Sequence, residues 1–246
     1  MHLRTDGLSG RRELTAMAKA GAGLVGEGIW RITNEILSAN TYVSRIGATT
    51  ECLLIDPGSD RSRIEDVLVR EALVPRHVLL THGHFDHCGS AAHFQEKFGC
   101  DVRIHASDLK IMKASNFLTM AFKIPFQLTV PVADCWQELS LDLGSDVVEV
   151  IPSPGHTPGS CIFRYGHAAF TGDTLYSSGI GLSRLPGENA ERLRTTLVQL
   201  METLPPDTMV YPGHGDPAPL AQIRQHNLPL LEFVGASGHP AGGPDP

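Results

Sequence analysis

The sequence lacks several features that mark specialised classes of protein. It has no run of about 18 apolar residues, so no membrane-spanning helix is expected. It also has no Cys-x-x-Cys pair, and its cysteine count of five is odd. This usage is typical of reduced, mostly buried thiols and favours a cytoplasmic location. The cysteines are Cys52, Cys88, Cys100, Cys135 and Cys161.

An excess of positive charge is missing as well. The chain has 20 Lys and Arg against 27 Asp and Glu, which gives a net charge of −7. A nucleic-acid partner would favour a basic surface, so no such partner is expected. The composition, 41% hydrophobic and 19% charged in 246 residues, is ordinary for a globular protein that buries a full core in one domain.

The two ends of the chain differ from its middle. Residues 1–27 include an Ala/Gly-rich stretch that Lys19 interrupts, and no clear cleavage site follows it. We therefore expect an N-terminal extension and not a signal peptide. Residues 235–246 are rich in Gly and Pro, which predicts a disordered tail. The folded domain is expected over residues 28–234.

What the chain does have is a dense cluster of histidines. His82-Gly83-His84-Phe85-Asp86-His87 places three imidazoles and one carboxylate in six residues, directly after an apolar run. Imidazole and carboxylate together suit zinc and iron. A lone histidine is usually a surface or core residue, but four such side chains so close together indicate a metal site.

Three further fragments each offer one more ligand in a Gly-rich turn after a short apolar segment. They are Pro154-Gly155-His156-Thr157-Pro158-Gly159, Thr171-Gly172-Asp173-Thr174 and Pro212-Gly213-His214-Gly215. Ligands on separate loops can converge only if the strands that carry them lie side by side. Sites built at strand ends are typical of α/β architectures.

The hydrophobic pattern predicts strands and helices around these loops. Apolar runs with turn residues between them predict strands over 29–33, 41–46, 52–56, 77–81, 102–105, 147–151, 161–165, 168–171 and 208–211. Helix-like spacing predicts helices over 61–73, 90–98, 190–203 and, with a doubt at Pro229, 220–233. This order fits two facing sheets with helices outside, but periodicity alone gives only an α/β or α+β class.

Together these motifs resemble the metallo-β-lactamase-fold hydrolases. The resemblance rests on His82-x-His84-x-Asp86-His87, His156, Asp173, His214 and an early Ile55-Asp56-Pro57-Gly58. Within that superfamily the chain is most similar to the short, single-domain glyoxalase II group, the hydroxyacylglutathione hydrolases. The resemblance implies a four-layer αββα sandwich.

The resemblance also implies a ligand set for two divalent ions, with zinc as the first candidate and iron or manganese as alternatives. His82, His84 and His156 match the ligands of a first metal, and Asp86, His87 and His214 match those of a second. Asp173 matches the carboxylate that bridges both, and Asp56 is expected beneath the metal loop, where it would accept hydrogen bonds from the loop backbone.

The implied activity is that of a dinuclear hydrolase in which a hydroxide shared by the ions attacks an acyl carbonyl. Asp86 and Asp173 are the expected catalytic side chains, Asp86 as a group that orients the hydroxide or carries its proton. A thiolate leaves without a proton donor because the pKa of a thiol is about 8.5, which favours a thioester as the small-molecule acyl substrate.

The acyl carrier stays open. In the segment that follows the bridging aspartate, relatives often have Gly-Cys-Gly or Ser-Ile-Gly followed by Lys or Arg, whereas here Gly179-Ile180-Gly181 is followed by Leu182. The cation that could meet a glutathione carboxylate is absent at that place, although Arg184 is near. Leu182 and Arg184 are therefore candidate pocket residues, and glutathione is in doubt as the carrier.

The segment 110–136 stands apart because it is apolar and interrupted by Pro125 and Pro131. One interpretation is a lid or pocket wall over the metals, with Phe117 and Phe122 as candidate contacts for substrate. The alternatives are a packed connection or a subunit contact in a homodimer.

Other functions remain open for this ligand set. A persulfide dioxygenase would use one iron on two histidines and a carboxylate, so the second set of ligands would not be needed. A lactonase or another ester hydrolase would use the same two metals, while a β-lactamase is disfavoured because some of these enzymes have Cys at the position of Asp173. A non-catalytic metal-binding module is the last alternative.

Overall fold

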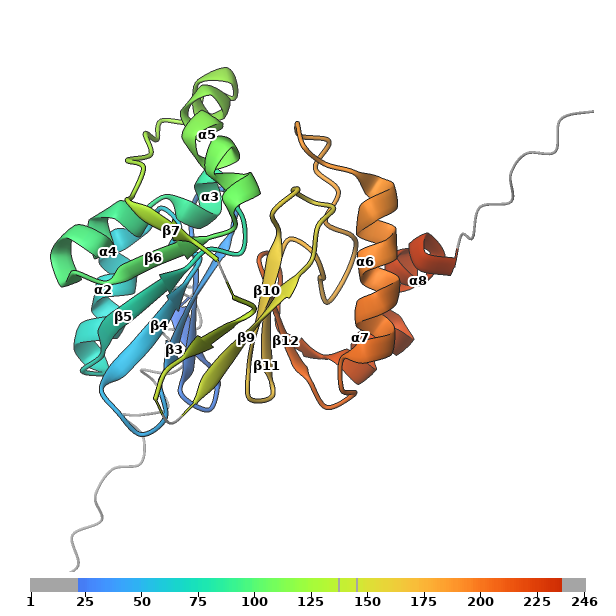
Figure 1. Ribbon diagram of the computed structural model, residues 1–246, viewed down its shortest axis with the longest axis horizontal. Helices are drawn as coiled ribbons and strands as arrows, with labels where there is room; N and C mark the ends of the chain where they lie inside the picture. The colour runs from blue at the N-terminus through green and yellow to red at the C-terminus, as the bar shows by residue number, and fades with distance from the viewer. Residues whose placement is uncertain (1–21, 137, 145, 236–246) are drawn as a thin grey trace, which may run out of the picture.

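Two β-sheets lie face to face in the computed structural model, which describes residues 22–136, 138–144 and 146–235 (Figure 1). Helices α2 (Arg61–Arg70) and α4 (Ala91–Phe98) cover the outer face of the first sheet. Helices α6 (Ala190–Thr203), α7 (Leu220–His226) and α8 (Leu228–Gly235) cover the outer face of the second. The expected four-layer αββα sandwich is confirmed.

The first sheet has the strand order β1-β2-β3-β4-β5-β6-β7 over the described residues. Neighbouring strands are antiparallel from β1 to β4 and parallel from β4 to β7. The strands are β1 Ala22–Gly26, β2 Ile29–Thr33, β3 Asn40–Arg45, β4 Glu51–Ile55, β5 Val74–Leu79, β6 Asp101–Ile104 and β7 Ala133–Cys135. Between β5 and α4 lies the single turn of α3 (Phe85–Cys88).

The second sheet has the order β13-β12-β11-β10-β9-β8 over the same part of the chain. All of its pairs are antiparallel except β11 with β12, which run parallel. The strands are β8 Ser140–Asp142, β9 Val147–Pro152, β10 Cys161–Tyr165, β11 Ala168–Gly172, β12 Met209–Pro212 and β13 Ala218–Pro219.

The layers follow from the alternation of side chains along the strands. In β4, Leu53 and Ile55 belong to the apolar cluster between the sheets, whereas Cys52 and Leu54 belong to the cluster under α2 and α4. Successive strand residues point to opposite faces, so a strand that is apolar at every position can be buried on both. The apolar run Cys52–Ile55 of β4 therefore lies between a helical layer and the partner sheet.

The second sheet uses the same alternation. In β10, Phe163 packs in the cluster between the sheets and Ile162 in the cluster under the outer helices. Helix α6 completes that outer cluster with Leu193, Leu197 and Leu200, whose spacing of four and three residues places them on one side of the helix.

Several local expectations change in the structure. The last helix is divided, because Asn227 separates α7 from α8. The segment 110–136 begins with helix α5 (Leu109–Ala121), which follows the short 3-10 turn η1 (Ala106–Asp108), and both of its prolines lie beyond α5. The predicted domain boundary at residue 28 falls between β1 and β2, which pair with each other.

The predictions for residues 1–21 and 236–246 lie outside the described residues. All five cysteines are free, and four of them are buried. Among the helices of the described chain, none is long and apolar enough to cross a membrane.

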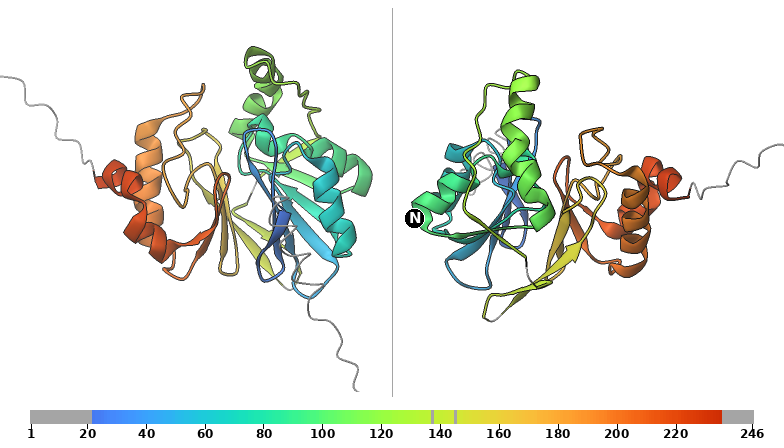
Figure 2. Two further views of the ribbon diagram at one scale, coloured as in Figure 1. Left: turned by 180° about the vertical axis from the view of Figure 1, so that it is seen from behind. Right: turned by 45° about the horizontal axis from the view of Figure 1, so that its top comes forward.

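The loops that carry the histidine motifs gather at one edge of the sandwich. Strands β5, β9, β11 and β12 end at Leu79, Pro152, Gly172 and Pro212, each shortly before a candidate ligand. Figure 2 shows α5 and the loop between β11 and α6 on opposite sides of this edge. The fold therefore brings together loops from both sheets that lie up to about half the chain apart.

Candidate metal centre

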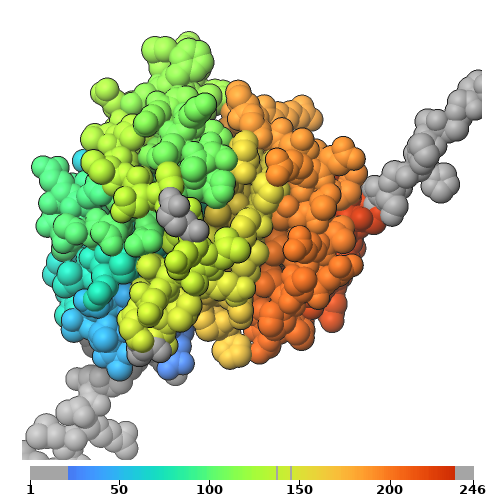
Figure 3. All heavy atoms as spheres, viewed as in Figure 1, coloured from blue at the N-terminus to red at the C-terminus, as the bar shows by residue number. Residues whose placement is uncertain are grey.

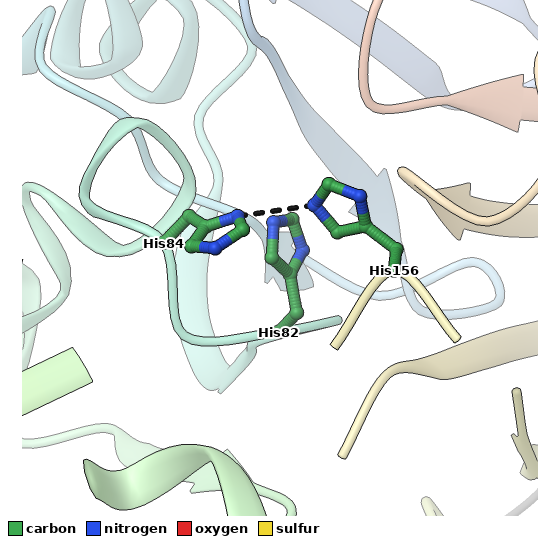
Figure 4. A group of neighbouring side chains, drawn as sticks. All are labelled: His82, His84 and His156. Carbon is green, nitrogen blue, oxygen red and sulfur yellow. Dashed lines mark hydrogen bonds between the residues drawn. The ribbon is translucent and has the colours of Figure 1, made fainter. Parts of the chain in front are cut away.

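Three imidazoles from two loops form a first ligand group, which we define as His82, His84 and His156. The ring nitrogens of this group lie within 4.8 Å of one another, and all three side chains are buried. Figure 4 shows the rings turned toward a common centre, with His84 Nδ1 3.0 Å from His156 Nε2. His82 and His84 come from the loop after β5, and His156 comes from the loop after β9.

A second ligand group lies beside the first and consists of Asp86, His87 and His214. His87 Nε2 is 3.4 Å from His214 Nε2 and 3.5 Å from Asp86 Oδ2. Asp86 and His87 belong to α3, so they extend the same loop that carries the first group. His214 reaches them from the end of β12 in the other sheet.

Asp173 lies between the two groups. Its Oδ2 is 3.4 Å from His156 Nε2 of the first group and 3.5 Å from His214 Nε2 of the second. Its Oδ1 is 3.4 Å from His87 Nε2. One carboxylate thus contacts ligands of both groups, which is the arrangement that a bridging ligand requires.

The residues fit divalent ions on two observations. His82 Nε2 and Asp173 Oδ1 are buried without a hydrogen-bond partner among the described residues, and a buried polar atom in that state is costly unless something binds it. Within each group, nitrogen and oxygen atoms that would bind an ion also lie 3.0–3.5 Å apart. Ligands at about 2.1 Å from a tetrahedral ion are separated by about 3.4 Å.

Asp56 orients two of the histidines, His87 directly and His82 through Thr81. Its Oδ2 accepts the Thr81 hydroxyl at 2.6 Å and the His87 Nδ1–H at 3.1 Å, while its Oδ1 accepts the backbone N–H of Thr81 at 2.8 Å. Because the Thr81 hydroxyl donates to Asp56, its oxygen accepts from His82 Nδ1 at 3.0 Å. When neutral, both imidazoles therefore present Nε2 as the free acceptor that a metal needs.

Asp56 also forms a geometric group with His82 and His87 that could hold a metal. Both of its carboxylate oxygens already accept hydrogen bonds from Thr81 or His87. We therefore assign Asp56 to orienting the ligands and not to binding an ion, as the sequence suggested.

Two glycines permit the close approach of the loops. A side chain at Gly172 would place its Cβ 2.3 Å from Thr81 Oγ1, and the backbone there has a φ of 48°. A side chain at Gly213 would place its Cβ 2.2 Å from Asp173 Oδ1. Neither distance is sterically allowed, so glycine is required at both places for the groups to meet.

Asp108 is a structural residue of the site that the sequence did not reveal. This buried carboxylate accepts the N–H of Gly83 at 2.9 Å, the N–H of Gly159 at 2.7 Å and the hydroxyl of Thr157 at 2.7 Å. It therefore joins the loop of His82 and His84 to the loop of His156. No motif surrounds Asp108 in the sequence, and only its place at the start of α5 brings it to both loops.

In the absence of ions, histidines of the two ligand groups differ in their pKa values. Burial lowers the pKa of His84 to about 4, helped by His156, and burial with neighbouring histidines also holds the pKa of His82 well below its usual value. Imidazoles with such pKa values are neutral at pH 7. His82 and His84 can thus bind a cation without first losing protons.

In the second group, by contrast, the pKa values of both histidines are raised, so these side chains are protonated at pH 7. Burial lowers the pKa of His87, but Asp173, Asp86 and Asp56 outweigh it and raise the pKa to about 9. Burial likewise opposes the hydrogen bonds from His214 to Asp173 and Asp86, which raise the pKa of His214 to about 10. Burial alone would raise the pKa values of Asp86 and Asp173, but the neighbouring histidines outweigh it and lower both values. Without ions the second group is a set of ion pairs.

Comparison with known proteins fits this geometry. The family model of the metallo-beta-lactamase superfamily matches residues 36–214, which include both ligand groups. The chain belongs to the metallo-beta-lactamase superfamily. The family resemblance drawn from the sequence is confirmed.

Relatives within the superfamily include hydrolases and a protein with two irons. Hydroxyacylglutathione hydrolase GloC of Haemophilus influenzae is 30% identical over 71% of this chain and 84% of its own length. The BLEG-1 B3 metallo-beta-lactamase is 30% identical, with a TM-score of 0.75 over 82% of this chain and 99% of that one. TTHA1623 in a di-iron-bound form is 30% identical, with a TM-score of 0.73 over 80% and 98%.

A cavity of about 530 Å³ opens above the ligand groups. His84, Asp86, His156, Asp173 and His214 contribute to its lining, so a molecule in this cavity would touch both groups. Apart from Tyr176 and Ser183, the walls are apolar, and they come from three segments of the chain. They include Leu37, Phe122, Ile124, Ile180, Leu182 and Leu185.

The structure separates the four pocket residues that the sequence suggested. Phe122 and Leu182 line the cavity, while Phe117 and Arg184 do not. Phe117 lies on α5 with 66% of its surface exposed. Arg184 has a left-handed backbone with a φ of 59°, and its N–H donates to Glu188. Tyr176, which the sequence reasoning missed, adds a hydroxyl-bearing ring to the lining.

Proposed function

We propose that the protein is a dinuclear metal-dependent hydrolase that cleaves acyl thioesters. The observation that carries this proposal is the position of Asp173, within 3.5 Å of ligand nitrogens from both groups and at the floor of the apolar cavity. A carboxylate shared in this way supports a pair of ions at the place where a substrate carbonyl would enter. A lone ion on the first group would leave the second group without a role.

The side chains of the two ligand groups fit divalent ions, and the ions and the side chains would have separate roles in the reaction. When bound, such ions supply Lewis acidity and lower the pKa of water from near 16 to about 7, so that hydroxide is available at neutral pH. Asp56 and Thr81 keep the histidine acceptors turned inward, and Asp173 is held ionised by its histidine neighbours. Asp86 lines the cavity as a second carboxylate and can accept the proton of an attacking water.

Hydrolysis consumes one water for each substrate. The carbonyl carbon gains a C–O bond and loses its C–S bond, so the products are a carboxylic acid and a thiol. A thiolate departs without a proton donor because the pKa of a thiol is about 8.5. An amide would require a proton donor for its amine, whereas a thioester does not. This favours a thioester over an amide.

The comparisons support this class of reaction in its broader form. GloC carries the name of a glutathione thioester hydrolase, and TTHA1623 is described with two irons. Zinc is our first candidate for both ions, with iron or manganese as alternatives, since sites of imidazole and carboxylate bind all three.

The test combines metal analysis with a substrate panel. We expect about two divalent ions for each chain and the release of thiol from acyl-thioesters. The panel should also contain lactones, a cephalosporin and a persulfide, with oxygen uptake followed for the last. One iron with oxygen uptake would replace this proposal by a persulfide dioxygenase, and turnover of lactones alone would replace it by a lactonase.

A further inference from the structure

The walls of the cavity bear on the class of substrate. All six wall residues named above are aliphatic or aromatic, and the described lining includes no lysine or arginine. We propose that the substrate enters this cavity with an uncharged, apolar chain, and that its carrier is not a glutathione-like thiol with free carboxylates. This inference rests on the proposed function, because it names the substrate class of the same site.

The rim of the cavity supplies the first support. Leu37, Phe122 and Leu182 are exposed by 58%, 56% and 40%, although all three are large and apolar. Leu37 is also held there by a left-handed backbone with a φ of 55°, a conformation that a bulky side chain rarely adopts. An apolar chain that covers these side chains removes them from water, which is favourable, whereas a carboxylate gains nothing from them.

The rim side chains come from separate parts of the fold. Leu37 lies between β2 and β3, Phe122 follows α5, and Leu182 lies in the loop between β11 and α6. In the space-filling view, the green atoms of the first half and the orange atoms of the second meet along the upper part of the face (Figure 3). An apolar chain in the cavity would thus contact both halves of the molecule.

The charges near the cavity supply the second support. Glu188 accepts hydrogen bonds from the backbone N–H groups of Ser183 and Arg184, beside the wall residue Leu182. Its carboxylate is therefore held against the loop that forms this wall of the cavity. A free carboxylate on the substrate would meet this negative charge. A carrier without charge avoids the repulsion.

Two matched substrate series test the inference. One series joins acyl chains of two to eight carbons to N-acetylcysteamine, an uncharged thiol, and the other joins the same chains to glutathione. With the metal-loaded protein, kcat/KM should be at least tenfold higher for the uncharged carrier at each length. It should also rise about fourfold for each added methylene until the cavity is filled, because each buried methylene contributes that factor.

A pair of variants connects the chain-length effect to the wall. Phe122→Ala should flatten the dependence of kcat/KM on acyl-chain length. Met120→Ala is the matched control, since Met120 lies in the same segment with 68% of its surface exposed and outside the lining. It should leave the dependence unchanged. Circular dichroism and metal content verify that both variants are folded and loaded.

The possible results distinguish this inference from the proposed function on which it rests. Preference for the glutathione series, or a flat dependence on chain length in the unmodified protein, would overturn the inference and leave the thioesterase proposal standing. A loss of the chain-length effect in Met120→Ala as well would also overturn it. Absence of thiol release from both series would reject the proposed function itself.

Discussion

Asp56 Oδ2 lies 3.1 Å from His87 Nδ1 and 2.6 Å from the hydroxyl of Thr81, so one oxygen orients ligands of both groups. Asp56→Asn would place an N–H donor against groups that already donate. Substitutions at such orienting residues typically cost 10- to 100-fold in metal affinity. We expect a loss of that size, measured by competition with a chelator.

The exposed Asp66→Asn on α2 is the matched control for Asp56, because it removes the same charge far from the ligands. Its metal affinity should equal that of the unmodified protein. Equal affinities for both variants would contradict the assigned role of Asp56.

A second prediction concerns His84, whose Nδ1 points to His156 in the first ligand group. His84→Ala should reduce turnover at least 100-fold and lower the metal content while the fold is retained. His93→Ala on α4 is the control, since His93 pairs with Glu65 at the surface. Thiol release, metal analysis and circular dichroism check the prediction. Full turnover by His84→Ala would remove His84 from the proposed mechanism.

Asp108 should matter for stability as well as for metal binding. Asp108→Ala leaves the N–H groups of Gly83 and Gly159 without their acceptor, and each buried unpaired group costs about 1–3 kcal/mol. We expect the free energy of unfolding in urea to fall by about 3 kcal/mol for the metal-free protein. Asp108→Asn keeps one acceptor oxygen and should lose less, whereas equal losses for both would argue against the hydrogen bonds as the cause.

Metal uptake by the second ligand group should release protons. Without ions the pKa values of His87 and His214 are about 9 and 10, so both are protonated at pH 7, and a metal binds only the neutral ring. Affinity should therefore increase as the pH rises toward these values. Calorimetry at pH 7 in two buffers with different ionisation enthalpies measures the release, and identical heats in both buffers would contradict it.

The same raised pKa values fix the sign of a stability effect in the metal-free protein. Pairing of His87 and His214 with Asp86 and Asp173 stabilises the fold fully below about pH 6.5, the ordinary pKa of histidine. That contribution should be lost as the pH rises through about 9 and 10. Urea titrations at pH 6, 8 and 10 would show it as a falling free energy of unfolding.

Leu182→Arg tests how charge at the wall affects substrate choice. A cation there should raise kcat/KM for a glutathione thioester about threefold, a size typical of an exposed ion pair, with most of the effect lost at high salt. Leu182→Gln is the neutral control for the loss of the leucine. No difference between the two variants would undercut a role for charge at this position.

The elements that the sequence predicted best are those with a complete local signal. Strand β10 and helix α6 have the predicted bounds, because each is a periodic apolar segment with turn residues on both sides. Strands β1, β7, β8 and β13 were missed. They are short or lie at the sheet edges, so few of their residues are buried and the apolar pattern is weak.

Tertiary contacts explain the break in the last helix. Asn227 Oδ1 accepts the N–H of Gly179, and its amide donates to the carbonyl of Tyr176. These partners lie about 50 residues away, so no local pattern predicts that the chain stops being helical at Asn227 instead of Pro229.

The ligand groups were predictable because each ligand lies in its own short motif, and the motifs occur in a recognisable order. Asp108 was not, because its partners Gly83 and Gly159 lie 25 and 51 positions away and the sequence around it resembles any helix start. Of the four pocket residues suggested by the sequence, only Phe122 and Leu182 line the cavity, because its walls also depend on contacts between distant segments. Whether Phe117 or Phe122 faces the ligands depends on where α5 ends.

Both sheets supply ligands to each group, and this has a mechanical consequence. His82, His84 and His87 follow a strand of one sheet, while His156 and His214 follow strands of the other. With ions bound to both groups, the sheets could not separate at this edge without breaking coordination on both sides. In hydrogen–deuterium exchange, stripping the ions should thus loosen the amides at the ends of β5 and β12 in step, as one opening event instead of two.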